Sequence, residues 1–242
     1  MDASTIVTLL AFCTCASFIQ RVSGFGFGIF VMTMLPHLMP SYGEATALSG
    51  ILSACLALYV VVRMRKNLSF KRQIPINVAF IVVSYFAISF VASIDGQFFK
   101  KILGVILIVI SVYFFFISEK IRIKASLPMQ IGMGSLSGVM GGMFAMPGPP
   151  AVLYFLASEP TKEGYLAGIQ TYFLISNVMM TVFRVKAGFV TESVGYAWCV
   201  GIVGVLVGAF IGSKVFKRVP TKILRKIVYA YMAVSGVIAI VM

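Results

Sequence analysis

Two glycine-rich stretches, each beginning with a serine, interrupt the apolar segments of this chain. The first is Ser23-Gly-Phe-Gly-Phe-Gly28, and the second runs from Ser137 to Gly148. Glycines at this density interrupt a helix and leave backbone N–H groups without a partner. The helix that follows directs the positive end of its dipole at the same point, and Pro149 and Pro150 suit the first turn of such a helix. Each stretch is therefore a natural site for an anion.

Arg21 precedes the first stretch and is the only basic residue deep within an apolar run of the sequence. Charges inside a membrane are costly and usually functional, so we expect Arg21 to face an anionic substrate. The structural alternative is that Arg21 snorkels to the membrane interface or bonds backbone carbonyls. Gln170 and Asn177 lie seven residues apart and share one helix face, where they are expected either to contact the substrate or to bridge helices.

The candidate substrate-binding residues combine these polar side chains with serines, glycines and a proline of the two stretches. They are Arg21, Ser23, Gly24, Gly26, Gly28, Ser137, Gly138, Gly141, Gly142, Pro147, Gly148, Gln170 and Asn177. Glycines spaced four apart also let membrane helices pack closely. We expect close packing for Gly204, Gly208 and Gly212, and a substrate role for the two stretches, whose glycine and proline content exceeds what packing needs.

The composition is that of an integral membrane protein. Apolar residues make up 60% of the 242 residues and charged residues 11%, whereas a soluble domain is about one quarter charged. The net charge of +13 does not indicate nucleic-acid binding, because the basic residues lie in short loops between apolar runs, as the positive-inside bias predicts. The four cysteines form no CxxC pair and lie in apolar segments, so neither a disulfide nor a metal site is expected.

The two halves of the chain resemble each other. Lys101-Ile102-Leu103 matches Lys222-Ile223-Leu224, 121 positions later, and Ser23–Gly28 matches Ser137–Gly142, 114 positions later. Matches in the same order predict a duplication within a single membrane transport domain, with residues 1–121 as the first repeat and 122–242 as the second. Each repeat is expected to contain a glycine-broken segment and three apolar spans. The broken segments are 4–38 and 128–158, and the spans are 44–62, 74–94, 98–118, 164–183, 193–213 and 222–241.

The distribution of Lys and Arg sets the expected topology. If each broken segment crosses the membrane once, the basic residues divide almost evenly between the two faces. If each one enters and returns on the same face, fifteen lie on one face and four, Lys100, Lys101, Arg184 and Lys186, on the other. The second arrangement obeys the positive-inside rule. We therefore expect an all-α integral membrane protein with an inverted repeat, each half a re-entrant helical hairpin plus three transmembrane helices, and with both termini outside.

These motifs resemble the TauE/SafE sulfite exporter family, also called the toluene-sulfonate uptake permease family. The likeness rests on Ser23–Gly28, on SGVMGGMFAMPGPPAVLYFL from Ser137 and on GYLAGIQTYFLISN, which ends at Asn177, and it covers nearly the whole chain. The resemblance implies a multi-pass carrier in the inner membrane of a bacterium or archaeon that exports sulfur-containing anions such as sulfite, sulfonates or sulfoacetate. The family often has glycines where Met143 to Met146 stand here, and this departure leaves the individual substrate open.

The sequence contains no catalytic constellation: it has no metal-ligand cluster, paired intramembrane carboxylates, Walker lysine or GxSxG motif. No enzymatic activity, cofactor or nucleic-acid partner is therefore expected. The expected partners are a small anionic substrate and the lipid bilayer, and a homodimer is left open. A cation carrier is the nearest rival to an anion carrier, although it would normally need an intramembrane Asp or Glu, and Glu44 and Asp95 lie at loop edges. A channel is also compatible with the sequence, and a membrane-embedded enzyme is less favoured.

Overall fold

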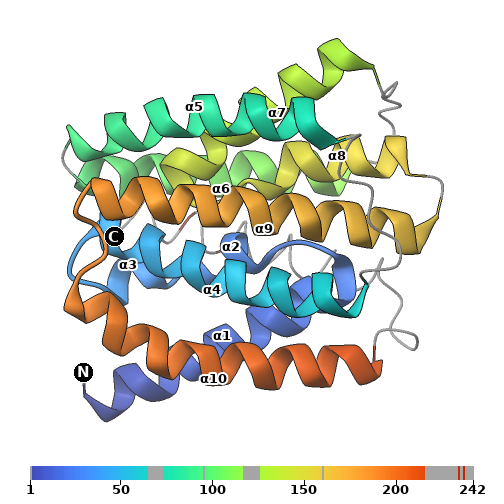
Figure 1. The fold of residues 1–242 in the computed structure, drawn as a ribbon. Helices are drawn as coiled ribbons and strands as arrows, with labels where there is room; N and C mark the ends of the chain where they lie inside the picture. Colours follow the sequence, from blue (N-terminus) through green and yellow to red (C-terminus); the bar gives the residue numbers. More distant parts are fainter. Residues whose placement is uncertain are drawn as a thin grey trace.

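The computed structural model describes residues 2–64, 73–94, 96–116, 126–159 and 161–215, together with positions 234 and 237. Within these ranges every regular element is a helix (Figure 1). In chain order the helices are α1 (Ala3–Ser23), α2 (Phe27–Val31), α3 (Leu35–Leu38), α4 (Tyr42–Arg63), α5 (Ile74–Ala92), α6 (Gly96–Phe116), α7 (Leu127–Phe144), α8 (Gly148–Ser158), α9 (Lys162–Lys186) and α10 (Glu192–Val215). The all-α prediction is confirmed. The span expected at 222–241 lies outside the described residues, apart from positions 234 and 237.

Local sequence signals explain where the long helices begin. Ser41 caps α4 by accepting a hydrogen bond from the backbone N–H of Glu44 at 3.1 Å, and Thr161 caps α9 through the N–H of Gly164 at 3.0 Å. A hydroxyl in this position satisfies one of the N–H groups that the first turn of a helix leaves free. Helices α5, α7 and α8 have proline in their first turn, where its missing N–H costs nothing.

Two helical segments are broken where the sequence predicts it. Helix α1 ends at Ser23, and the chain turns through Gly24 and Gly26, with φ of 88° and 110°, into α2 and α3. Helix α7 ends at Phe144 and is capped by Ala145, with φ of 56°, before α8 begins at Gly148. Residues with a side chain rarely adopt positive φ, so glycine suits the first break, whereas Ala145 adopts this conformation at a cost that the surrounding packing must offset.

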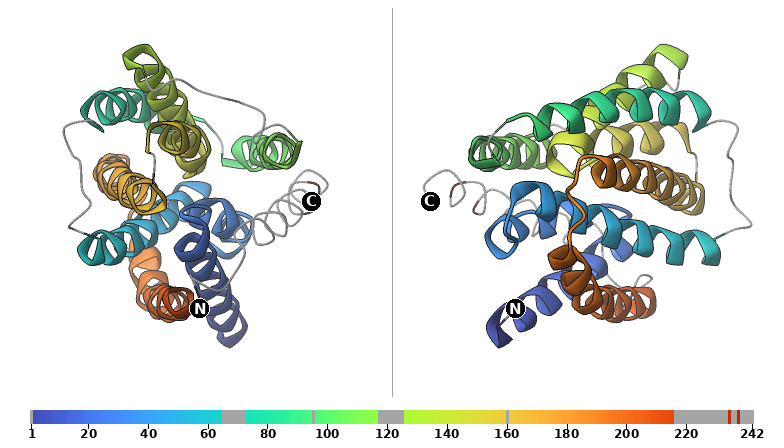
Figure 2. Two further views of the ribbon diagram at one scale, coloured as in Figure 1. Left: turned by 90° about the vertical axis from the view of Figure 1, so that its right-hand side faces the viewer. Right: turned by 60° about the vertical axis from the view of Figure 1, so that its left-hand side comes forward.

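Three pairs of long helices form the body of the molecule (Figure 2). Helix α1 packs along α10, α5 packs along α7, and α4 packs against α9 between these two pairs. Glycines permit the close approach: a Cβ added to Gly138 would lie 2.9 Å from the carbonyl oxygen of Phe80, and one added to Gly208 would collide with the carbonyl oxygen of Thr14. This is the small-residue packing of membrane helices. The expectation of close packing for the three glycines of α10 is confirmed.

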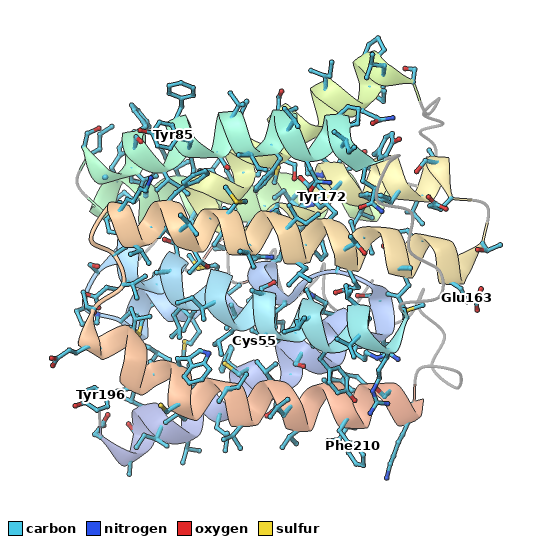
Figure 3. All side chains as sticks on the ribbon, viewed as in Figure 1. Cys55, Tyr85, Glu163, Tyr172, Tyr196 and Phe210 are labelled. Atoms are coloured by element: carbon cyan, nitrogen blue, oxygen red, sulfur yellow. The ribbon has the colours of Figure 1, made fainter. Side chains whose placement is uncertain are left out.

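The outer surface of the protein is apolar and rich in aromatic side chains. Within the described ranges, α1, α4, α5, α9 and α10 are long and apolar enough to cross a membrane. Tyr85, Tyr196 and Phe210 are exposed at the periphery, whereas Tyr172 is buried in the interior (Figure 3). An apolar surface of this extent is what a lipid bilayer covers, because soluble proteins rarely expose large apolar patches.

Candidate functional site

Ser23 shapes the first helix break. Its hydroxyl lies 2.8 Å from the carbonyl oxygen of Ile19 and 2.6 Å from that of Phe25, and it accepts a hydrogen bond from the N–H of Phe25 at 3.3 Å. The side chain is buried. Its hydrogen-bonding capacity is therefore used within the turn that separates α1 from α2.

Ser137 has the matching position at the second break. Its hydroxyl donates to the carbonyl oxygen of Pro147 and accepts a hydrogen bond from the hydroxyl of Tyr172 at 2.6 Å. Tyr172 belongs to α9, so these two hydrogen bonds connect α7, the second break and α9. The buried hydroxyls thus fix the course of the chain at a point where helical hydrogen bonds are interrupted.

The two breaks meet inside the protein. A Cβ added to Gly28, in α2, would collide with the carbonyl oxygen of Ala145, at the end of α7. A small pocket lies at this contact. It is lined by Gln20, Gly26, Gly28, Ile29, Ser53, Ala145, Met146, Pro147, Gly148 and Phe173. In this conformation the pocket has room for about one water molecule, so it must widen to hold a polyatomic anion.

Two buried glutamines connect the first break to α9. The side-chain amide of Gln170 donates to the carbonyl oxygen of Gly24 at 2.8 Å, and that of Gln20 donates to Oε1 of Gln170 at 3.3 Å. Oε1 of Gln20 in turn accepts a hydrogen bond from the N–H of Phe27 at 3.2 Å. The backbone groups on both sides of the first break are therefore satisfied by side chains.

Comparison with known proteins decides the family. The family model described as sulfite exporter TauE/SafE matches residues 9–239, nearly the whole chain. The chain belongs to the TauE/SafE family. Neither the curated proteins nor the solved structures contain a match to it. TauE/SafE is a family of transporters and not of enzymes, so the predictions of the family and of a non-enzymatic membrane protein are confirmed.

The pocket between the two breaks of this TauE/SafE protein contains part of the predicted site. Four of the predicted residues line it, namely Gly26, Gly28, Pro147 and Gly148. Two more are one hydrogen bond away, because Gln170 bonds Gln20 and the side-chain amide of Asn177 donates to Oγ of Ser53 at 3.2 Å. Gln20 and Ser53 both line the pocket. The polar face predicted for α9 is thus directed at the place where the two breaks meet.

The remaining glycines predicted for the TauE/SafE site make packing contacts. Cβ atoms added to Gly138 and Gly142 would meet α5, in the second case 2.5 Å from Cβ of Ala87. Gly141 faces the ring of Phe80, and Gly24 packs against the ring of Tyr165. None of these four glycines is among the pocket-lining residues of the described chain. A role for them in substrate binding stays a prediction.

Arg21 lies on the side of α1 that faces α10. Its Nε donates to Oγ of Ser213 at 3.0 Å, and Tyr59 and Arg63 are close enough to interact with it electrostatically. The side chain is half-buried and does not line the pocket. Its neighbour Gln20 lines the pocket instead, and sequence analysis missed this residue because adjacent residues on a helix face different directions.

The prediction that Arg184 lies in a loop is wrong. Helix α9 continues three residues past the expected end at 183, and the side chain of Arg184 is completely buried. Its Nη2 donates to the carbonyl oxygen of Gly141 at 2.9 Å. The sequence does contain a signal for the burial of Arg184. Gln170, Asn177 and Arg184 follow one another at intervals of seven residues, so they share one face of the helix.

The chemistry available around the pocket is hydrogen-bond donation. Within the described ranges, no three His, Cys, Asp or Glu side chains are grouped so that they could hold a metal ion. The polar side chains that line or border the pocket are amides and hydroxyls, with the guanidinium of Arg184 farther along α9. Such donors suit an anion, and a guanidinium forms the strongest of these hydrogen bonds.

Proposed function

We propose that this TauE/SafE protein is a secondary transporter that exports small sulfur-containing anions, such as sulfite, sulfonates or sulfoacetate, across the inner membrane of a bacterial or archaeal cell. The anion is held where the two broken helices meet. The observation that carries the proposal is the pocket shared by the two breaks, with Gly28 on one side and Ala145 and Gly148 on the other. Family membership supports the transport of sulfur anions.

The groups around the pocket favour a negative charge. Helix α8 begins at Gly148, so the positive end of its dipole faces the pocket. Pro149 and Pro150 carry no N–H, so Gly148, which lines the pocket, is the residue that supplies a backbone donor at the first three positions of α8. Gln20 and Ser53 add side-chain groups that are able to donate.

In this proposal the two halves form an inverted repeat, with re-entrant hairpins made of α1–α3 and α7–α8. Reciprocal packing supports it, because α10 of the second half packs along α1 of the first, and α5 of the first half packs along α7 of the second. The course of the chain agrees: α1 begins and α3 ends at the left of Figure 1, whereas α7 begins and α8 ends at the right. Broken helices in inverted repeats are typical of secondary transporters.

Both termini face outside in this topology, and residues 63–72 and 214–226 face the cytoplasm. Because Arg184 is buried, only three loop Lys and Arg residues remain on the outer face, against fifteen on the cytoplasmic face, and this division follows the positive-inside rule. Helices α4 and α10 both end at the right of Figure 1, as a shared face for these two segments requires.

A thermal-stability screen tests the proposed function. Purified protein is heated with sulfite, sulfate, thiosulfate, sulfoacetate, taurine or simple carboxylates, with choline as a cation control. A ligand at 100 times its Kd stabilises the folded state by about 2.7 kcal/mol. We expect at least one sulfur-containing anion to raise the melting temperature and choline to leave it unchanged. A protein stabilised by choline and by no anion would contradict the proposal.

Flux measurements then separate a carrier from a channel. The anion that stabilises the protein is loaded into liposomes containing the purified protein, and its release is followed with and without the same anion outside. We expect saturation and faster release when the anion is also present outside, because a carrier returns loaded. Flux that neither saturates nor shows counter-exchange would indicate a channel.

A further inference from the structure

The largest fully buried side chain in the described part of the protein carries a positive charge. Arg184, on α9, is 0% exposed. Its Nη2 donates to the carbonyl oxygens of Gly141, at 2.9 Å, and Gly142, at 3.4 Å, in the last turn of α7. Its Nε and Nη1 have no hydrogen-bond partner among the described residues. Three of the five N–H donors of this guanidinium are therefore unused.

A purely structural role explains only part of this arrangement. The carbonyl groups at the end of α7 carry the negative end of the helix dipole, which accounts for the contact with Nη2. It does not account for the other donors, because burying unpaired polar groups and an uncompensated charge is costly. Among the described residues, Tyr42 interacts with Arg184 electrostatically, and no carboxylate does.

Gly50, on α4, lets the guanidinium of Arg184 approach α4 closely. A Cβ added to Gly50 would lie 2.9 Å from Nη1 of Arg184, 3.8 Å from Oγ1 of Thr181 and 4.0 Å from Oδ1 of Asn177. About one turn farther along α4, Ser53 accepts a hydrogen bond from Asn177 and lines the pocket between the breaks. The polar face of α9 therefore leads from that pocket to Arg184.

Ser49 is a second buried group with unused hydrogen-bonding capacity. Within the part of the chain that the structure describes, its Oγ has no hydrogen-bond partner, and it lies 3.7 Å from the point that a Cβ on Gly28 would occupy. Gly28 lines the pocket, and Ser49 directly precedes Gly50. Buried polar groups nearly always have hydrogen-bond partners in native proteins. The unpaired donors of Arg184 and Ser49 therefore indicate a ligand rich in acceptor oxygens.

We propose that Arg184 is the cationic group that binds the anionic head of the transported substrate through Nε and Nη1, and that Gly50 lets the guanidinium take this position beside α4. This inference rests on the proposed function. Sulfite and sulfonate groups offer several acceptor oxygens, and charge-assisted hydrogen bonds to a guanidinium are stronger than neutral ones. Because Nη2 also contacts α7, an anion held by Arg184 is linked to the helix that leads into the second break.

Calorimetry on purified full-length protein tests the assignment with sulfite and sulfoacetate as probes. Arg184→Gln is expected to weaken binding about ten- to a hundredfold, because it removes charge-assisted hydrogen bonds. Arg184→Lys keeps the charge without the planar donors and is expected to bind with intermediate affinity. The melting temperature of each variant without anion is recorded beside the affinity. If Arg184→Gln melts at a lower temperature but binds both anions as tightly as the wild type, Arg184 only supports α7 and the proposal is overturned.

Gly50→Ala gives a second test that does not depend on folding of the Arg184 variants. Its methyl group would lie 2.9 Å from Nη1, so the guanidinium must move. Gly132→Ala is the matched control, since its added Cβ meets no atom of the described residues within 4 Å. We expect weaker anion binding for Gly50→Ala and unchanged binding for Gly132→Ala; equal affinities overturn the assignment. A wild-type protein that binds neither anion would instead contradict the proposed function, so the two failures are distinguishable.

Discussion

Gly28 and Ala145, which lie in different halves of the chain, touch through their backbones. The carbonyl oxygen of Ala145 occupies the space that a Cβ on Gly28 would need. Because the obstacle is a backbone atom, it cannot rotate away as the end of a side chain would. The break between α1 and α2 is therefore coupled to the break between α7 and α8 at a point beside the pocket.

Gly28→Ala is expected to destabilise the protein by about 1–3 kcal/mol, because the added methyl group must separate two backbone segments. We also expect it to abolish binding of sulfite, since the displaced segments line the pocket. Melting temperature and calorimetry measure the two effects. Gly148→Ala is the control for stability: its Cβ would lie 3.5 Å from the ring of Phe173, an ordinary contact. Equal melting temperatures for the two variants would contradict the contact between Gly28 and Ala145.

The packing of α1 along α10 leads to a second prediction. A Cβ at Gly208 would collide with the carbonyl oxygen of Thr14, so Gly208→Ala is expected to cost about 1–3 kcal/mol of stability. Gly195 lies on the same helix, and a Cβ added there would meet none of the described residues within 4 Å. Gly195→Ala should therefore be neutral or stabilise the protein by up to about 1 kcal/mol. Denaturation of the detergent-solubilised protein compares the two. A Gly208→Ala variant as stable as Gly195→Ala would show that the two helices are farther apart.

Much of the fold could be predicted because its signals are local. Low charge and long apolar runs indicate an all-helical membrane protein. Gly24 and Gly26 adopt positive φ, a conformation that glycine tolerates without strain. Prolines after Gly148 mark the beginning of the returning helix. The positions of both breaks therefore follow from residue types within a few positions of each break.

The side chains that surround the pocket could not be predicted equally well. Arg21 and Gln20 are neighbours, and only the rotation of α1 against α10 decides that Gln20 lines the pocket while Arg21 bonds Ser213. Arg184 lies near the end of an apolar run, where a basic residue normally belongs to a loop. Its burial depends on the carbonyl group of Gly141, which comes from another helix and leaves no mark in the sequence around Arg184.

The proposed topology predicts that residues 63–72 and 214–226 are cytoplasmic. Single cysteines are introduced at Lys66 or Lys217 after the four native cysteines have been replaced. Both should resist an impermeant thiol reagent added to intact cells and react after the cells are permeabilised, because the basic loops stay inside. A cysteine at Ser4, near the N-terminus, is the outward-facing control. If the cysteines at positions 66 and 217 were labelled from opposite faces of the membrane, the paired re-entrant hairpins would be ruled out.

Transport of a charged substrate is expected to depend on membrane voltage. No Asp or Glu is among the fully buried side chains of the described residues, so coupling to a proton through a buried carboxylate is not expected. An anion that leaves a cell with a negative interior gains about 2.3 kcal/mol per unit charge per 100 mV. Flux of sulfite in liposomes should therefore change when a potassium–valinomycin potential is reversed. Flux that ignores the potential and follows a pH gradient would indicate proton coupling.

Gln20→Glu tests whether the anion occupies the pocket between the breaks. The substitution keeps an oxygen that can accept the hydrogen bond from Phe27, but it adds a negative charge to the pocket lining. Like charges about 4 Å apart repel by about 4 kcal/mol near a protein surface, so sulfite affinity should fall about tenfold or more. Gln20→Met is the matched control, because it loses the same amide and adds no charge. The Met variant should be less stable, since the N–H of Phe27 loses its partner, but it should bind sulfite more tightly than the Glu variant. Equal sulfite affinities in the two variants would place the anion outside this pocket and leave the unpaired donors of Arg184 as its binding groups.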